Sequence, residues 1–216
     1  LQMTSVPLVQ LHNQLASGDQ QLPLNEVMRS DGVLDAMDRI RAEGLTDFIG
    51  FTALGDASAC RSVVESDRVD TAQVYYNLIN PSAGFDIEGH WHSDDYTGLL
   101  AACQQFNVGV LGIRVYAAGI LASRVEHGRE IPVTRNSDYD SELRRADMVR
   151  EILAEMAGSD AQKALRFVLD QDAIHGAVIG LAEMSHLQGA IQATQMDPLS
   201  SSVTKALKDL WSRDYR

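Results

Sequence analysis

The chain has 216 residues, 45% of them hydrophobic, and a formal net charge of -12 at pH 7. This length and composition are typical of one globular domain, which we place over residues 1–216. The acidic balance argues against a nucleic-acid partner, because attraction to a phosphate backbone requires a basic face. No run of about 18 apolar residues predicts a membrane span, and the first residues lack the layout of a signal peptide. We therefore expect a cytoplasmic protein with a small-molecule ligand.

Short apolar runs alternate with amphipathic segments along the whole chain. Apolar runs too short for a helix predict five strands, at residues 6–11, 48–52, 70–76, 109–114 and 177–180. Helical spacing of apolar residues predicts helices that begin after N-cap residues Ser30 and Asp31, Asp56, Ser93, Ser141 and Ser159, and two more at about 184–195 and 200–212. The first of these helices covers 32–43 and the Ser141 helix ends at Gly158. The last predicted strand is 177–180.

This alternation predicts an α/β fold with a parallel sheet, since parallel strands need crossover connections and both faces of such a sheet are buried. The alternation alone leaves open whether the sheet is open, as in a Rossmann fold, or closed into a barrel. No GxGxxG sequence follows any predicted strand. Its absence argues against the common dinucleotide-binding motif.

Neither the cysteines nor the histidine-rich segment predicts a metal site. Cys60 and Cys103 fall within helical patterns, so we interpret them as packing residues. Segment 88–95 contains His90, His92 and several acidic residues, which could be interpreted as a metal site. Because a helix is predicted to begin at Ser93, we interpret Asp94 and Asp95 instead as first-turn acids that complement the helix dipole. We expect no bound metal.

Polar side chains stand at the predicted carboxyl ends of the strands. Ligands of α/β proteins gather at those ends, in open sheets and in barrels alike. These candidates are His12 and Asn13, Thr52 and Ala53, Gln73 with Tyr75–Asn77, Arg114–Gly119 and Gly180–Glu183.

The ordered series of strand ends resembles the aldo-keto reductase family. Leu8–Asn13 looks like the fourth strand of that family, which ends in a histidine, and Ile49–Thr52 resembles its fifth-strand IGxS motif. Gln73–Leu78 is similar to the QxxYNL signature of the sixth strand, the most specific of these matches. Residues 109–121 look like the seventh strand with its PLxxGxL turn, and 162–180 resemble the ALRWxL…VIPG stretch before strand eight.

The resemblance implies the C-terminal part of a (β/α)8 TIM barrel, with strands 4 to 8 and their helices. The active-site aspartate, tyrosine and lysine of the family lie on earlier strands, so we expect a missing N-terminal half-barrel. Without the tyrosine acid, positioned proton transfer is lost, a factor of about 10²–10⁴ in rate. We therefore expect this chain alone to be inactive.

The activity implied by the resemblance is reduction of a carbonyl, or oxidation of an alcohol, with NADP or NAD as the cofactor. The cofactor does the hydride chemistry while the protein positions it. His12 would be the catalytic residue that orients the substrate carbonyl, as a neutral imidazole can hydrogen-bond that oxygen. Thr52 and Gln73 would hold the nicotinamide carboxamide.

Further cofactor contacts are implied after the last two strands, where the sequence departs from the family pattern. Arg114 falls near the ring-stacking aromatic of the family, and it either stacks, reaches a phosphate or forms a salt bridge across the strand ends. Tyr116 replaces the leucine of the phosphate turn. The other residues of that turn that we assign to cofactor binding are Ala117 and Gly119.

At the adenosine end we assign Gly180, Ala182 and His186, where backbone amides at a helix start suit a phosphate. The family's usual basic residue and asparagine are absent here, so the preference for NADP or NAD stays open. His186 or the loop residues Arg124 and Arg129 are alternative sources of positive charge.

Two other functions compete with the reductase. One is a catalytically inactive subunit of the same fold that binds a nucleotide, or a partner through open sheet edges. The other is an unrelated barrel enzyme, which would need a lysine or paired carboxylates at strand ends. The reductase interpretation predicts that His12, Thr52, Gln73 and Arg114 converge on one cavity.

Overall fold

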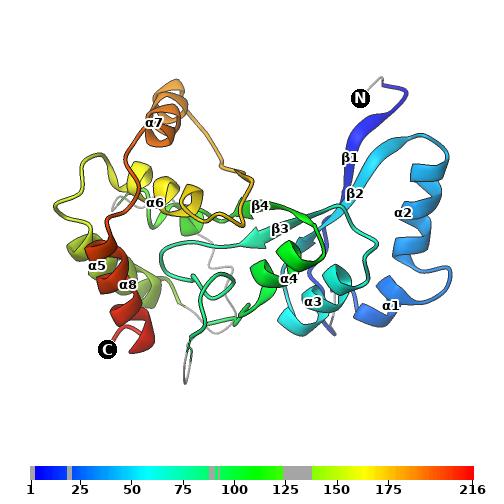
Figure 1. Ribbon diagram of the computed structural model, residues 1–216, viewed down its shortest axis with the longest axis horizontal. Helices are drawn as coiled ribbons and strands as arrows, with labels where there is room; N and C mark the ends of the chain where they lie inside the picture. The colour runs from blue at the N-terminus through cyan, green and yellow to red at the C-terminus, as the bar shows by residue number, and fades with distance from the viewer. Residues whose placement is uncertain (1–2, 19–20, 88–90, 92, 124–137) are drawn as a thin grey trace.

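The computed structural model describes residues 3–18, 21–87, 91, 93–123 and 138–216 (Figure 1). Five strands form one parallel sheet in which the spatial order follows the chain order, β1-β2-β3-β4-β5. The strands are β1 (Val6–Leu11), β2 (Thr46–Ala53), β3 (Thr71–Tyr75), β4 (Gly109–Ile113) and β5 (Gly176–Ala177).

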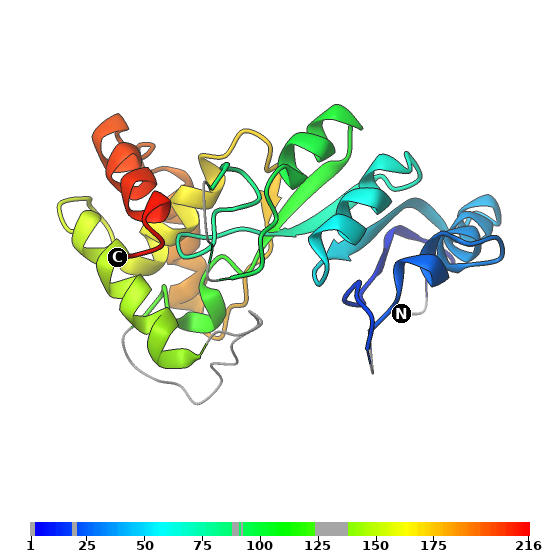
Figure 2. The same cartoon turned by 90° about the horizontal axis from the view of Figure 1, so that it is seen from below.

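Helices connect the strands and cover one face of the sheet. α2 packs on β2, α4 on β4 and α6 on β5. The two termini lie far apart along the long axis, with α1 and α2 near one end and α5, α7 and α8 near the other (Figures 1 and 2). The helices are α1 (Leu24–Met28), α2 (Val33–Ala42), α3 (Ala57–Glu65), α4 (Leu99–Gln105), α5 (Tyr139–Ile152), α6 (Asp160–Leu169), α7 (Met184–Thr194) and α8 (Ser201–Ser212), with a 3-10 turn η1 at Ala117–Gly119.

The two faces of the sheet differ in polarity. Side chains of a strand alternate between faces, and in β2 the fully buried Ile49, Phe51 and Ala53 lie on the helix-covered face. Burying each such large apolar side chain stabilises the fold by about 1.5–3 kcal/mol. Gly50 and Thr52 alternate with them and lie on the opposite, inner face. On this inner face, β1, β2 and β3 carry the polar side chains of Gln10, Thr52, Thr71 and Gln73.

The predicted α/β class is confirmed, and so are several element boundaries. β1 covers the predicted 6–11, and α2 lies within one residue of the predicted 32–43 at each end. Asp56 caps α3 by accepting hydrogen bonds from the amides of Ser58 and Ala59. Ser159 caps α6 in a reciprocal capping box with Gln162. Each cap joins residues no more than three positions apart, which explains why the sequence predicts them.

The predicted cap at Ser93 is wrong, because α4 begins at Leu99 after Gly98, whose φ is +80°. Asn80 holds the preceding segment in a turn by donating to the Ser93 hydroxyl and the Asp94 carbonyl. Asp94 and Asp95 therefore lie before the helix and not in its first turn.

Two further predicted caps are also wrong. α5 begins at Tyr139 after Asp138, whose carboxylate accepts from the amide of Ser141, so Ser141 lies inside the first turn. This hydrogen bond lowers the pKa of Asp138 below its usual value. The same helix ends at Ile152, before the predicted Gly158. Gly32 is the N-cap of α2, and no side chain, including those of Ser30 and Asp31, caps it.

The fifth strand is shorter than predicted. β5 covers only Gly176–Ala177, although the amide of Val178 still donates to the carbonyl of Gly112 at 2.9 Å. Residues 179 and 180 leave the sheet and face a cavity instead. Both cysteines are free and buried, as the packing interpretation predicts.

Candidate functional site

A cavity of about 810 Å³ lies where the carboxyl ends of the strands meet the start of α7. The residues that line it come from segments far apart in sequence, so only the fold brings them together. They are His12, Thr52, Leu54 and Gln73 from β1 to β3, residues 113–116, 118, 119, 122 and 123 after β4, Ser159, Ala161 and Gln162 at the start of α6, residues 178–182 after β5, and Ser185, His186, Gly189 and Ala190 on α7.

One side of this cavity, which we call the strand wall, consists of His12, Thr52 and Gln73. Parallel register places Thr52 of β2 directly beside Gln73 of β3. The Nδ1 atom of His12 lies 2.9 Å from the Thr52 hydroxyl, which donates to Oε1 of Gln73 at 3.4 Å. Thr52 is buried, whereas His12 is exposed to the cavity. The strand wall thus presents an imidazole, a hydroxyl and an amide in contact with one another.

A second group of lining residues, which we call the turn wall, comes from the segments 114–123 and 178–186. Its first half is a tight turn in which Arg114, Ala117 and Ala118 have φ values of 61°, 45° and 57°. A non-glycine residue in this left-handed region costs about 1–2 kcal/mol, so the surrounding structure has to impose the conformation. Such strain concentrates at functional sites.

Remote side chains hold this turn in place. Asn77, fully buried after β3, donates from Nδ2 to the carbonyl of Arg114 at 2.8 Å. Arg150 of α5 donates to the carbonyls of Ile120 and Ser123, and its guanidinium forms ion pairs with Asp160 and Asp147. Only 7% of the Arg150 side chain is exposed. The turn is therefore held from both β3 and α5.

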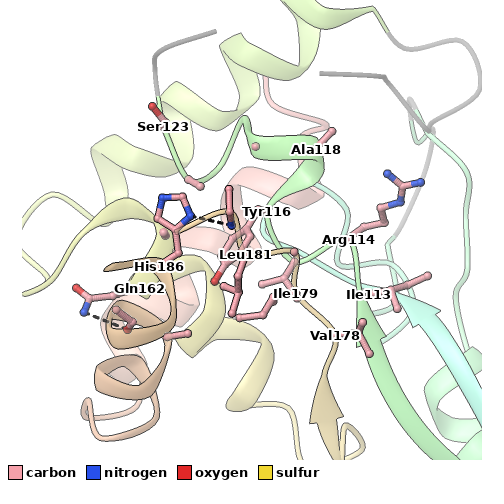
Figure 3. A pocket seen from close by; sticks show the side chains of 18 of the residues that line it. Ile113, Arg114, Tyr116, Ala118, Ser123, Gln162, Val178, Ile179, Leu181 and His186 are labelled. Carbon is pink, nitrogen blue, oxygen red and sulfur yellow. Dashed lines mark hydrogen bonds between the residues drawn. The ribbon is translucent and has the colours of Figure 1, made fainter. Parts of the chain in front are cut away.

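The two large side chains of the turn differ in burial. Tyr116 is half-buried, and burial raises the pKa of its phenol above the usual value. Arg114 is exposed and forms no ion pair within the described part of the chain. Figure 3 shows its guanidinium directed away from Tyr116 and His186. Arg114 therefore places a positive charge at the rim of the cavity.

The second half of the turn wall is tied to α6 and α7. The Nδ1 atom of His186 accepts a hydrogen bond from the amide of Ala182 at 3.4 Å (Figure 3). Gln162 of α6 donates to the carbonyl of Gly189 at 3.2 Å, which joins α6 to α7. No atom lies within 4 Å of a Cβ built on Gly180, so its backbone faces open space. A ligand can approach the main chain closely at that point.

The electrostatics of the cavity contrast with those of the chain. The chain carries a net charge of -12, yet the described residues that line the cavity include no aspartate or glutamate. They do include Arg114, His12 and His186. A lining with one fixed cation, two imidazoles and no carboxylates favours an anionic ligand.

The predicted convergence of His12, Thr52, Gln73 and Arg114 on one cavity is observed. The other predicted site residues that line it are Tyr116, Gly119, Gly180, Ala182 and His186. Ala117 does not line it, because its side chain is buried in the core. The amides of Ala117 and Gly119 donate to carbonyls of the same turn, at 2.9 Å each.

Sequence reasoning missed Arg150 and Gln162, which build the turn wall, and it named Asn77 only as a strand-end candidate. Asn77 belongs to the QxxYNL match, so the sequence pointed to this residue. It did not reveal the hydrogen bond of Asn77 to the carbonyl of Arg114. Arg150 and Gln162 act through contacts 10 to 30 residues away in sequence, which no local pattern reveals.

Metal-ligating side chains do not gather within the described residues. No group of three or more histidine, cysteine, aspartate or glutamate side chains there could hold a metal ion, and His90, His92, Arg124 and Arg129 lie outside the described residues. No described helix is long and apolar enough to cross a membrane.

Comparisons with known proteins identify the family. The model of the Aldo/keto reductase family matches residues 1–212, whereas a search of curated proteins found no match. Among solved structures, an aldo-keto reductase from Bacillus halodurans is similar over 100% of this chain, in its apo form (17% identity, TM-score 0.67) and its holo form (15%, 0.69). The glycerol dehydrogenase of Gluconobacter oxydans is similar over 98% of the chain (19% identity, TM-score 0.65).

This chain spans 67% of the apo chain, 63% of the holo chain and 60% of the glycerol dehydrogenase. At these identities the likeness shows the fold, and the five parallel strands with their helices correspond to part of the (β/α)8 barrel, as predicted. The fold and the family match over residues 1–212 lead to one conclusion. The chain belongs to the aldo/keto reductase family.

Proposed function

We propose that this chain forms the cofactor-binding side of an NAD(P)(H)-dependent oxidoreductase that interconverts a small-molecule carbonyl and its alcohol. The observation that carries the proposal is the meeting of His12, Thr52 and Gln73 with Arg114 around one cavity that lacks carboxylates among its described residues. A dinucleotide needs polar groups for its nicotinamide and a cavity without negative charge for its phosphates.

The strand wall fits the nicotinamide end. A carboxamide carries both donors and an acceptor, and the Thr52 hydroxyl and Gln73 amide offer both in return. The bound nicotinamide would supply or accept the hydride. His12 would orient the substrate oxygen next to it, because its ring is exposed to the cavity while Thr52 fixes its Nδ1 side.

The turn wall fits the phosphates and the adenosine. Arg114 supplies a guanidinium whose planar fork suits phosphate oxygens, and we assign Tyr116 and Gly119 to the same part of the cofactor. Gly180, Ala182 and His186 would contact the adenosine end.

The open sheet edges add a second part to the proposal. Within the described residues, β1 and β5 each pair with only one strand. We propose that further strands complete the barrel and bring the proton donor that the reaction needs beside His12.

A second candidate function is a catalytically inactive subunit that binds the nucleotide or a partner. One observation favours it: Tyr116 is the sole phenol among the described lining residues, and it lies on the turn wall, whereas His12 lies on the strand wall. Both candidates share the cofactor site, so turnover distinguishes them.

The test is calorimetric titration of the protein with NADPH and NADH, followed by assays of nicotinamide absorbance with aldehyde and ketone substrates. Saturable binding with turnover by the protein that includes the proposed further strands supports the oxidoreductase, and binding without turnover by that protein supports the inactive subunit. Absence of binding to either cofactor contradicts both.

A pair of glutamine variants locates the site. Gln73→Leu removes an amide that we assign to the carboxamide, so we expect the Kd of the cofactor to rise about tenfold, the effect of one hydrogen bond of about 1.4 kcal/mol. Gln105→Leu alters an exposed glutamine at the end of α4 and leaves the Kd unchanged. Equal Kd values for Gln73→Leu and the unmodified protein would remove Gln73 from the site.

A further inference from the structure

The strands β1, β2 and β3 lie side by side in the sheet (Figure 1). Their side chains form one continuous hydrogen-bonded chain that extends the strand wall along the inner face of the sheet. Beyond the contacts of Thr52 with His12 and Gln73, Nε2 of Gln73 donates to Oε1 of Gln10 at 2.6 Å. Nε2 of Gln10 then donates to the hydroxyl of Thr71 at 3.1 Å. Five side chains from three strands are thus connected in series, from Thr71 to His12.

Gly50 makes this connection possible. Gln10 and Thr71 stand on β1 and β3, which are not neighbours, and Gly50 of β2 lies between them in register with both. A Cβ at position 50 would lie 2.1 Å from Oγ1 of Thr71 and 3.2 Å from Nε2 of Gln10. Any side chain there would therefore block the contact across β2.

The chain runs in a single donor direction. The Thr52 hydroxyl has one proton, and it donates that proton to Oε1 of Gln73. With that proton directed to Gln73, the Thr52 oxygen is left to accept from Nδ1 of His12 at 2.9 Å, which fits the tautomer protonated at Nδ1. The Gln73 amide is held in this orientation because its other end donates to Gln10. Each hydrogen bond in the series thus fixes which atom donates in the next one.

We propose that Gln10 is a positioning residue that sets the tautomer of His12, through Gln73 and Thr52, with the proton on Nδ1 and the lone pair on Nε2. The hydrogen bond at one ring nitrogen decides which nitrogen of a histidine is protonated. This inference rests on the proposed function for its consequence. Neutral His12 accepts a hydrogen bond from the hydroxyl of an alcohol substrate through Nε2, and it cannot donate one to a carbonyl oxygen from that atom. This differs from the neutral donor that the family resemblance implies.

Two substitutions at Gln10 give opposite expectations. Gln10→Glu keeps an acceptor for Nε2 of Gln73, so the donor direction and the His12 tautomer are retained. Gln10→Lys offers only donors. It requires the Gln73 amide to turn over, donate to Thr52 and release the Thr52 proton toward Nδ1 of His12, which moves the ring proton to Nε2.

The experiment is ¹⁵N–¹H multiple-bond NMR of the histidine rings in the cofactor-free protein, at a pH where His12 is neutral, with His12 assigned from the spectrum of His12→Asn. We expect Nε2 of His12 to give the unprotonated nitrogen signal, in contrast to free histidine, which favours the proton on Nε2. Gln10→Glu should preserve this signal, and Gln10→Lys should change the ratio of tautomers by roughly fivefold, the size expected from one neutral hydrogen bond.

Gln105→Lys is the matched control, because it makes the same charge change on the exposed end of α4 and should leave the His12 signals unchanged. The inference is overturned if Nε2 carries the proton in the unmodified protein, or if Gln10→Lys has no more effect than Gln105→Lys. Since no cofactor or substrate is present, this outcome is independent of the binding and turnover tests of the proposed function.

Discussion

The two walls of the cavity are built in different ways. The strand wall carries its polar side chains on regular parallel strands, so register alone places Thr52 beside Gln73. The turn wall has an irregular, left-handed backbone that Asn77 and Arg150 hold from distant segments. One cavity thus combines a wall whose geometry follows from local pattern with a wall whose geometry depends on remote contacts.

The largest effect is expected where α8 packs against α6 and the segment after β3. Trp211 is buried against Phe85 and Phe167, and its Nε1 donates to the carbonyl of Leu78 at 3.0 Å. Trp211→Ala should lower the free energy of unfolding by about 3–5 kcal/mol, measured by urea denaturation. Trp211→Phe should cost only about 1 kcal/mol, because Tyr215 still donates to Leu78. Equal losses would contradict a packing role.

A substitution that disrupts only the turn wall should have a smaller effect on stability. Arg150→Met removes the hydrogen bonds to Ile120 and Ser123 and the ion pair with Asp160, which is itself partly exposed. We expect a loss of about 2–3 kcal/mol in the free energy of unfolding. The exposed Arg144 on the same helix provides the control, since Arg144→Met should change stability by less than about 0.5 kcal/mol. A similar loss in both variants would refute the special role of Arg150.

The buried thiols of α3 and α4 predict that the stability of the fold depends on pH. Burial raises the pKa of the Cys60 and Cys103 thiols to about 12, from an ordinary 9.0. Unfolding releases their protons above pH 9, so the stability that the neutral thiols contribute is complete below pH 9 and is lost between pH 9 and 12. Each thiol should lower the free energy of unfolding by about 1.4 kcal/mol per pH unit in this range.

Urea denaturation at pH 8, 9 and 10 measures this slope. The double variant Cys60→Ala and Cys103→Ala should fall less steeply above pH 9 than the unmodified protein. Parallel curves for the two proteins would show that the thiols ionise as readily in the folded state as in the unfolded one.

The smallest effect is expected at the N-cap of the helix that follows the strand wall. Asp56→Ala removes the cap of α3, the helix that follows Thr52 and β2, and should cost about 1 kcal/mol. The exposed Asp172, on a loop after α6, serves as the control. If Asp172→Ala were as costly as Asp56→Ala, general charge effects and not capping would account for the loss.

Particular elements show how far sequence reasoning reaches. The Asp56 and Ser159 caps could be predicted because a cap and its amides lie within three residues. Ser93 does not cap the helix because Asn80, thirteen residues away, donates a hydrogen bond to its hydroxyl and holds the turn. The site residues of the strand wall could be predicted because parallel strand ends meet at one edge of the sheet. Gln10 gave no signal, since its role depends on the absence of a side chain at Gly50.

Periodicity and short motifs predicted the order of the strands and of every helix except α1, the family, and the side chains at the strand ends, because these are local properties of the chain. The conformation of the turn after β4, the burial of Ala117 and the hydrogen-bonded connection between Gln10 and His12 follow from the tertiary structure alone. These features rest on contacts between segments distant in sequence, whose approach is fixed only when the helices pack and the strands adopt their register.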